Sequence, residues 1–170
     1  MATRVRIEHT YEVDEDTFWD RVFLDEEYNR RLYLEGLRFE SYALKSQEES
    51  DTEVKRTIDV TPRLGDLPGP MKKVLGDNLS YLENGVYDKP KRRYYVNIIP
   101  SSLPSKIKVT GELHTEPAGD KQCRRIFEAN VEVKVLGLGR LMEKRIVDDL
   151  QKGYSRGARF TNEYVKEKGL

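Results

Sequence analysis

Four polar side chains fall at positions that predicted strands turn inward, among apolar neighbours. They are His9, Tyr11, Arg56 and Tyr81. A buried arginine or histidine is costly unless it is paired or hydrogen-bonded, so its presence on an inward face needs a physical reason. One interpretation is that these groups orient the polar head of a ligand, as a few convergent polar groups do in an apolar pocket. The other is that they are satisfied within the protein or lie at the wet end of a strand.

Groups that could support catalysis or hold a metal are sparse in this sequence. It contains no Gly-x-Ser-x-Gly, no His-Glu-x-x-His and no phosphate-binding loop. The histidines, His9 and His114, are predicted on different faces, and Cys123 is the single cysteine, so a transition-metal site lacks ligands. We therefore predict no metal and no cofactor, and we assign no catalytic residue. Acid–base chemistry by His9 or a tyrosine stays open, but it needs a second ionisable group nearby.

The composition excludes several classes of protein. Lysine and arginine number 30 and aspartate and glutamate 30, so a neutral chain has no general electrostatic reason to bind nucleic acid or an anionic membrane. One cysteine excludes an intrachain disulfide framework and is typical of a reducing compartment. No segment is apolar over a membrane-spanning length, and the N-terminus lacks a signal-peptide core. We expect residues 1–170 to form a single cytoplasmic domain.

The longest periodic element that could position these groups covers Leu138–Val165. Apolar or small residues recur there at spacings of three and four, which is one face of an α-helix. That face comprises Leu138, Leu141, Met142, Ile146, Leu150, Tyr154, Ala158, Thr161 and Val165. Glu143, Lys144 and Asp148 are among the residues expected on the solvated face. At about 1.5 Å per residue the helix is roughly 40 Å long, and its apolar face needs a broad sheet to cover it.

An alternating strand and two short helices are predicted at the start of the chain. Arg4–Val13 alternates between polar and apolar residues, as a half-buried strand does. Asp14 and Asp25 are suited to cap the helices that follow, because aspartate accepts hydrogen bonds from the first free N–H groups. Apolar residues over 18–23 and over 28–36 mark the two helices themselves.

Six further strand candidates precede the long helix. Most alternate in polarity and are separated by short turns. The candidates are Leu37–Lys45, Glu53–Thr61, Leu79–Tyr87, Arg93–Ile99, Ile107–His114 and Ile126–Val135. Hairpin-length connections require antiparallel pairing. Asn84-Gly85 is a hairpin signal, but the turn at 88–91 follows too closely for both to close hairpins, so a bulge is predicted near Gly85. The expected class is α+β, with about six to seven antiparallel strands, two short helices after the first strand, and a long C-terminal helix.

Three stretches make this order of elements more specific: YEVDEDTFWDRV, the Leu67-Pro68 loop and VEVKVLGLGRLMEKRIVDDL. Together they resemble the helix-grip fold of the START-like (SRPBCC) superfamily over essentially the whole chain, and most closely an uncharacterised bacterial START-like family. The superfamily includes steroidogenic-acute-regulatory lipid-transfer domains, birch-pollen-allergen-like proteins and polyketide cyclases. The resemblance implies a curved sheet wrapped around the C-terminal helix, with an apolar molecule held in a cavity between the two.

Strand parity and this resemblance together predict the residues that bind the ligand. The candidate lining comprises Tyr11, Ile58, Tyr81, Val109, Phe127, Val131, Met142, Ile146 and Leu150. His9 and Arg56 are the predicted polar anchors. The predicted function is binding, transport or sensing of a lipid or other apolar small molecule, with no enzymatic activity and no nucleic-acid partner. Two alternatives stay open: a cyclase- or dehydratase-like enzyme using the same cavity, and a protein-interaction module with a filled core.

The loop Leu64–Gly76 also allows two interpretations. Its apolar and basic residues suit a gate that touches a membrane or a protein partner transiently while ligand passes. It is equally consistent with an ordinary connection that covers one edge of the sheet. Lys72 and Lys73 alone are too few for stable membrane anchoring, so we expect no stable membrane insertion.

Overall fold

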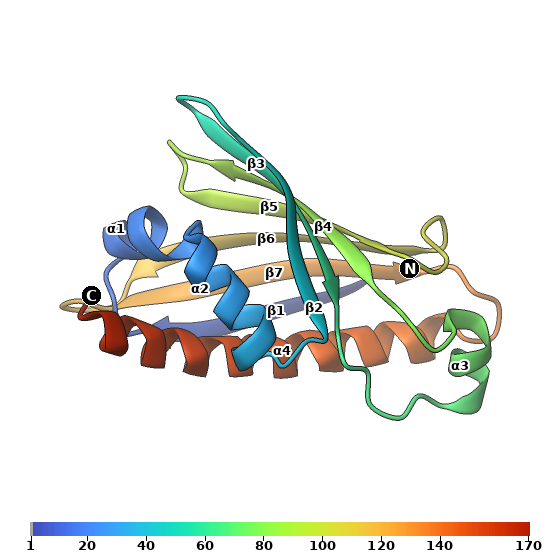
Figure 1. Cartoon of the computed structure of the whole chain (residues 1–170). Helices are drawn as coiled ribbons and strands as arrows, with labels where there is room; N and C mark the ends of the chain where they lie inside the picture. Colours follow the sequence, from blue (N-terminus) through green and yellow to red (C-terminus); the bar gives the residue numbers. More distant parts are fainter. Residues whose placement is uncertain (1) are drawn as a thin grey trace.

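Seven antiparallel strands form one continuous sheet in the computed structural model, which describes residues 2–170 (Figure 1). The strands stand in the order β1-β7-β6-β5-β4-β3-β2, so only the pair of β1 with β7 joins strands distant in sequence. Their bounds are β1 Thr3–Tyr11, β2 Ser41–Glu49, β3 Glu53–Thr61, β4 Tyr81–Asp88, β5 Arg93–Pro100, β6 Ile107–Pro117 and β7 Cys123–Val133. The predicted α+β class and antiparallel sheet are confirmed.

Two short helical units follow β1, as the sequence predicts. Each starts as an α-helix and widens into a π-helical segment, with bounds α1 Glu15–Thr17, η1 Phe18–Phe23, α2 Glu26–Arg31 and η2 Leu32–Gly36. An aspartate caps each unit: Asp14 Oδ1 accepts from the N–H of Thr17 at 2.8 Å, and Asp25 Oδ1 accepts from the N–H of Tyr28 at 2.9 Å. These carboxylates satisfy free N–H groups and lie at the positive ends of the helix dipoles.

The C-terminal helix α4, Gly139–Lys168, lies along the sheet and packs on β1, β7 and η2 (Figure 1). The predicted apolar face supplies most of its buried side chains. The buried residues that belong to the predicted face are Met142, Ala158, Thr161 and Val165. No helix within residues 2–170 is long and apolar enough to cross a membrane.

The first turns of α4 depart from the predicted pattern. Leu141, predicted on the apolar face, is 46% exposed, and Glu143, predicted on the solvated face, is only 6% exposed. The Glu143 carboxylate accepts hydrogen bonds from Thr3 Oγ1 at 2.7 Å and from the N–H of Val133 at 3.0 Å. Desolvation opposes ionisation of Glu143, but these two hydrogen bonds and nearby positive charge, including Arg140, together lower its pKa. Glu143 therefore anchors the start of α4 to the ends of β1 and β7.

The predicted strand 37–45 is wrong at its start, because β2 begins four residues later. The chain first completes the preceding helical turn. The N–H of Leu37 donates to the carbonyl of Leu32, and the N–H of Phe39 donates to the carbonyl of Tyr33, both at 2.8 Å. Leu37 and Phe39 then pack in an apolar cluster with Tyr33, so tertiary burial replaces the strand pairing that their alternation suggests.

The predicted bulge at Gly85 is also wrong. Gly85 pairs in register with both neighbouring strands. Glycine is needed there because the ring of Tyr94 occupies the space in which a side chain would lie. The irregularity lies instead in β2, where Lys45 has no partner between Leu44 and Ser46.

Apolar packing closes both ends of the space between the sheet and α4. At one end, Trp19 stacks on Tyr87 in an aromatic cluster, with ring centroids 4.8 Å apart. At the other end, the helix α3, Gly69–Leu75, buries Met71 in a cluster with Met142. Figure 1 shows α1 and α3 at opposite ends of α4. The middle of the interior is where side chains leave space.

Candidate functional site

A cavity of about 510 Å³ lies between these two packed ends. Its walls are the inner face of the sheet, one face of α4, the η2 segment and the loop around α3. Seven of the eleven predicted ligand-binding residues lie in its lining: Tyr11, Arg56, Tyr81, Val109, Met142, Ile146 and Leu150. The volume lies within the range of about 300–1,000 Å³ that is typical of small-molecule pockets.

The other four predicted residues do not line the cavity. Ile58 and Val131 are fully buried in packed clusters, and the ring of Tyr154 covers Phe127 with centroids 4.3 Å apart. His9 lies on the edge strand β1, beside α4. All four side chains point to the inner side of the sheet, as strand parity predicts. Other side chains lie between them and the cavity.

Arg56 is the centre of a satisfied polar network in the cavity wall, and it is 5% exposed. Its Nε donates to Tyr94 Oη at 3.1 Å, and the hydroxyls of Tyr94 and Tyr33 donate to the Glu83 carboxylate at 3.0 and 2.8 Å. Arg56 Nη2 lies 4.0 Å from Glu83 Oε1, and the guanidinium lies 4.8 Å from the centroid of the Phe23 ring. Burial raises the pKa of both tyrosines, so they remain neutral donors. Arg56 and Glu83 therefore compensate each other's charge.

Arg125 is a second buried arginine in the cavity wall, on β7, and it is 3% exposed. Its Nη2 contacts His9 Nδ1 at 2.7 Å and the carbonyl of Tyr154 at 3.4 Å. Its guanidinium carbon lies 4.6 Å from the ring centroid of Tyr154 and 5.2 Å from that of Tyr11. Within residues 2–170, its Nε has no hydrogen-bond partner. No carboxylate in this part of the chain forms an ion pair with it.

His9, on the edge strand β1, holds the guanidinium of Arg125 in place. Its Nδ1 accepts from Arg125, and its Nε2 lies 3.3 Å from Ser155 Oγ on α4. Desolvation, and then the positive charge of Arg125, lower the pKa of His9. At neutral pH the ring is therefore uncharged, and the tautomer with the proton on Nε2 satisfies both contacts. This arrangement makes His9 a positioning residue for Arg125.

The lowered pKa of His9 predicts a loss of stability on acidification. The folded-state pKa lies below the unfolded value of about 6.5, so the unfolded chain binds more protons, and the free energy of unfolding falls as the pH drops below about 6.5. We expect His9→Gln, whose amide oxygen can still accept from Arg125, to reduce this dependence in urea unfolding between about pH 7 and about pH 5. His114→Gln should remove a separate share of the dependence, because burial also lowers the pKa of His114, so the double variant should lose both shares. Equal pH dependence in wild type and His9→Gln would contradict the assignment.

Arg125 and Glu83 are two charged residues of the cavity wall that the sequence-based prediction missed. Strand parity could have found Glu83, and it would have found Arg125 if the predicted strand had begun at Cys123, where β7 begins. Arg125 stands two residues before Phe127, and Glu83 stands two residues after Tyr81, so each shares the inward face of its strand.

The described residues offer neither a metal site nor a reactive thiol. Within residues 2–170, no three His, Cys, Asp or Glu side chains are grouped as metal ligands would be. Cys123 is fully buried at the start of β7, and desolvation raises the pKa of its thiol to about 12. A thiol that stays protonated at neutral pH is a poor nucleophile.

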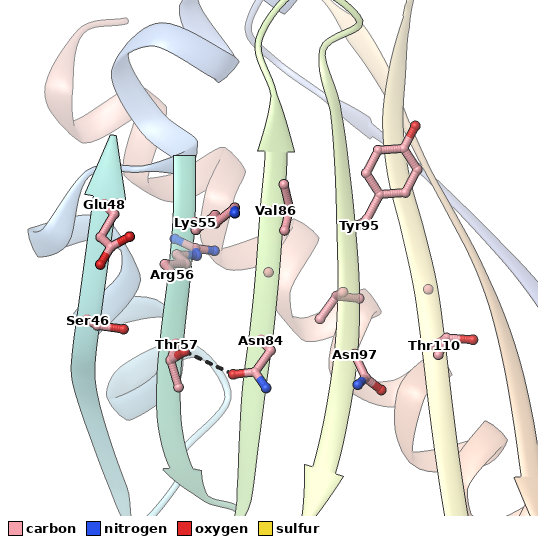
Figure 2. Close-up of a pocket in the computed structure, with 13 residues that line it drawn as sticks. Ser46, Glu48, Lys55, Arg56, Thr57, Asn84, Val86, Tyr95, Asn97 and Thr110 are labelled. Atoms are coloured by element: carbon pink, nitrogen blue, oxygen red, sulfur yellow. Dashed lines mark hydrogen bonds between the residues drawn. The ribbon is translucent and has the colours of Figure 1, made fainter. Parts of the chain in front are cut away.

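A second hollow, of about 600 Å³, lies on the outer face of strands β2 to β6 (Figure 2). Figure 2 shows Thr57, Asn84, Asn97 and Thr110 side by side across four strands, and Thr57 Oγ1 donates to Asn84 Oδ1 at 2.9 Å. These groups project from a single surface and do not converge from several sides, as the polar groups of a ligand pocket do. The interior cavity is therefore the candidate site.

Comparison with protein families gives one match. The sequence matches a family described as "Protein of unknown function (DUF2505)" over residues 6–165. None of the curated proteins compared with the chain matches it.

Solved structures share the fold at low sequence identity. Zhui aromatase/cyclase from Streptomyces sp. R1128 is 10% identical, with a TM-score of 0.68, over 100% of this chain and 97% of that one. Norcoclaurine synthase from Thalictrum flavum, solved with dopamine and hydroxybenzaldehyde, is 15% identical, with a TM-score of 0.59, over 98% and 88%. The major latex-like protein 151 of Panax ginseng is 9% identical, with a TM-score of 0.60, over 96% and 97%. These likenesses confirm the predicted helix-grip fold.

Proposed function

We propose a ligand-binding function for this chain, which belongs to the DUF2505 family of proteins of unknown function and has the helix-grip fold. The ligand is a lipid or another apolar small molecule, held between the sheet and α4. The observation that carries the proposal is the cavity of about 510 Å³ inside an otherwise packed core. Protein interiors are close-packed and leave few voids larger than a water molecule. A space of this size is therefore best explained as the binding site of a small molecule.

The face of α4 that borders the cavity suits an apolar molecule. Met142, Ile146, Leu150 and Tyr154 recur every four residues and all lie in the lining. Val109 lies in the opposite wall, on the sheet. Each buried methylene contributes about 0.8 kcal/mol, so a ligand with about ten carbons gains enough to offset much of the cost of immobilisation.

The segment 62–76 is the part of the wall best suited to admit a ligand. It pairs with no strand, so its displacement would break no ladder hydrogen bonds. A hydrogen bond of 3.1 Å from Arg145 Nη1 to the carbonyl of Asp66 holds it against α4. The lining residues that it supplies are Pro62, Arg63, Leu64, Gly65, Leu67, Met71 and Leu75. We assign it the role of a gate, which allows transient contact with a membrane or a partner during transfer.

Native mass spectrometry tests the binding function directly. We expect the protein purified from cells to carry about one small apolar molecule per chain, released by denaturation and identifiable after solvent extraction. Added dodecanamide, an uncharged amphiphile, should also bind the emptied protein in isothermal titration calorimetry. A bare mass together with no dodecanamide binding would contradict the proposal and favour an interaction module.

An enzyme of the cyclase or dehydratase kind is the second candidate, because ionisable groups do converge in the cavity wall. Glu83 is the group closest to a general base there. However, its two oxygens already accept hydrogen bonds from Tyr94 and Tyr33, and its charge is matched by Arg56. A carboxylate occupied in this way is poorly placed to take a proton from a substrate, so binding without turnover is the better supported function.

A further inference from the structure

The two buried arginines of the cavity differ in how their charges are compensated. Arg56 lies beside the Glu83 carboxylate. Arg125 is buried to a similar degree but has no carboxylate partner within residues 2–170. Removal of a charge from water costs free energy that a partner of opposite charge normally offsets. Arg125 is therefore a buried cation whose counter-charge the described part of the chain does not supply.

The hydrogen bonds of Arg125 lead to the same conclusion. A guanidinium has five N–H donors in a planar fork that matches a carboxylate or a phosphate. Within residues 2–170, its hydrogen bonds engage Nη2 alone, and both acceptors, the His9 ring and the Tyr154 carbonyl, are neutral. Desolvation and the charge of Arg125 keep His9 neutral, so His9 accepts from the arginine but supplies no counter-charge.

The whole lining of the cavity is cationic, although the chain is neutral. It contains six basic side chains and two acidic ones, a formal charge of +4. Glu83 lies beside Arg56, and Asp149 pairs with Arg145 at 3.0 Å. Among the described residues, the basic lining side chains left without a carboxylate are Arg63, Arg125, Lys152 and Arg156, of which all but Arg125 are exposed. Exposed cations in the lining, together with the buried one, attract anions toward the cavity.

We infer that the ligand of this cavity is an anionic amphiphile whose carboxylate or phosphate head group pairs with Arg125, an inference that rests on the proposed binding function. The head group supplies the missing counter-charge and accepts from the free N–H groups of the guanidinium. The apolar part then extends from Tyr154 along Leu150 and Ile146 to Met142, toward α3. These residues span about 18 Å of helix, which suits an elongated tail.

The test compares two probes that differ mainly in charge, dodecanoate and dodecanamide, by isothermal titration calorimetry at about pH 7.5. Wild-type protein is expected to bind dodecanoate at least about tenfold more tightly, the size of one charge-assisted hydrogen bond. Arg125→Met should reduce that preference to about twofold or less and leave dodecanamide binding intact. Arg125→Lys, which retains the charge, should keep part of the preference. Monododecyl phosphate, as a third probe, separates a phosphate head group from a carboxylate.

Arg124→Met is the matched control, because Arg124 is the neighbouring residue on β7 but is exposed and pairs with Glu116. It should bind both probes as wild type does. Equal affinity of wild-type protein for all three probes would overturn the inference and leave the binding function intact. Retention of the full preference by Arg125→Met would overturn it in the same way. Failure of every probe to bind would instead count against the binding function itself.

Discussion

Replacement of Gly85 by alanine is expected to destabilise the protein by about 2–4 kcal/mol in urea unfolding. A Cβ atom at this position would lie 1.7 Å from Tyr94 Oη and 2.1 Å from its Cζ, far inside van der Waals contact. The Tyr94 ring cannot move aside freely, because its hydroxyl links Arg56 to Glu83 inside the cavity wall. One added methyl group therefore both overpacks the core and disturbs the hydrogen bonds of two buried charges.

Gly153→Ala is the matched control for this substitution. Apart from its chain neighbours and the backbone of α4 itself, no atom lies within 4 Å of a Cβ built at Gly153, in the middle of α4. Alanine there should therefore raise stability by about 0.5–1 kcal/mol through its helix propensity. In a Tyr94→Ala background, Gly85→Ala should cost little further, since the clashing atoms are gone. If Gly85→Ala were as harmless as Gly153→Ala, the placement of Tyr94 across β4 would be wrong.

The double variant Ile146→Trp/Leu150→Trp is expected to weaken dodecanamide binding at least about tenfold, or about 1.4 kcal/mol. Both side chains lie on the face of α4 that borders the cavity, one helical turn apart. Two indole rings would occupy space that the ligand needs, and they would bury apolar surface in doing so, so the fold should persist. Calorimetry measures the binding, and thermal unfolding checks the fold.

Leu141→Trp is the control on the same helix, because Leu141 is 46% exposed and lies outside the cavity lining. It should leave dodecanamide binding unchanged. Undiminished binding by a folded Ile146→Trp/Leu150→Trp variant would place the ligand elsewhere, and the outer hollow of Figure 2 would become the candidate site.

The fold was predictable because its signals are local. Period-two alternation identifies strands, a spacing of three and four identifies α4, and Asp14 and Asp25 mark helix starts through their own hydrogen bonds. The errors arise where tertiary packing overrides the pattern. Phe39 alternates like a strand residue but is used to cover the Tyr33 cluster. Glu143 follows the polar period of the helix but lies where α4 passes over two strand ends.

The site was predictable only in part, since parity assigns a face but not a distance. Ile58 and Val109 both face inward, yet only Val109 reaches the cavity, because a cluster around Tyr33 covers Ile58. Arg125 was missed for a simpler reason. The predicted strand began at residue 126, whereas β7 begins at Cys123, so Arg125 fell outside the predicted strand and parity assigned it no face.

The bulge in β2 affects whether separate copies of this chain can pair edge to edge. β2 is the last strand of the sheet, so one row of its backbone N–H and C=O groups has no partner strand within residues 2–170. Long, flat edges of this kind are templates for aggregation, and a kink or a charge on the edge discourages it. The unpaired residue of the bulge is Lys45, and Glu48 and Glu49 follow it. A chain with a cavity in its interior thus also carries a kink and charges on this edge, which discourage pairing with copies of itself.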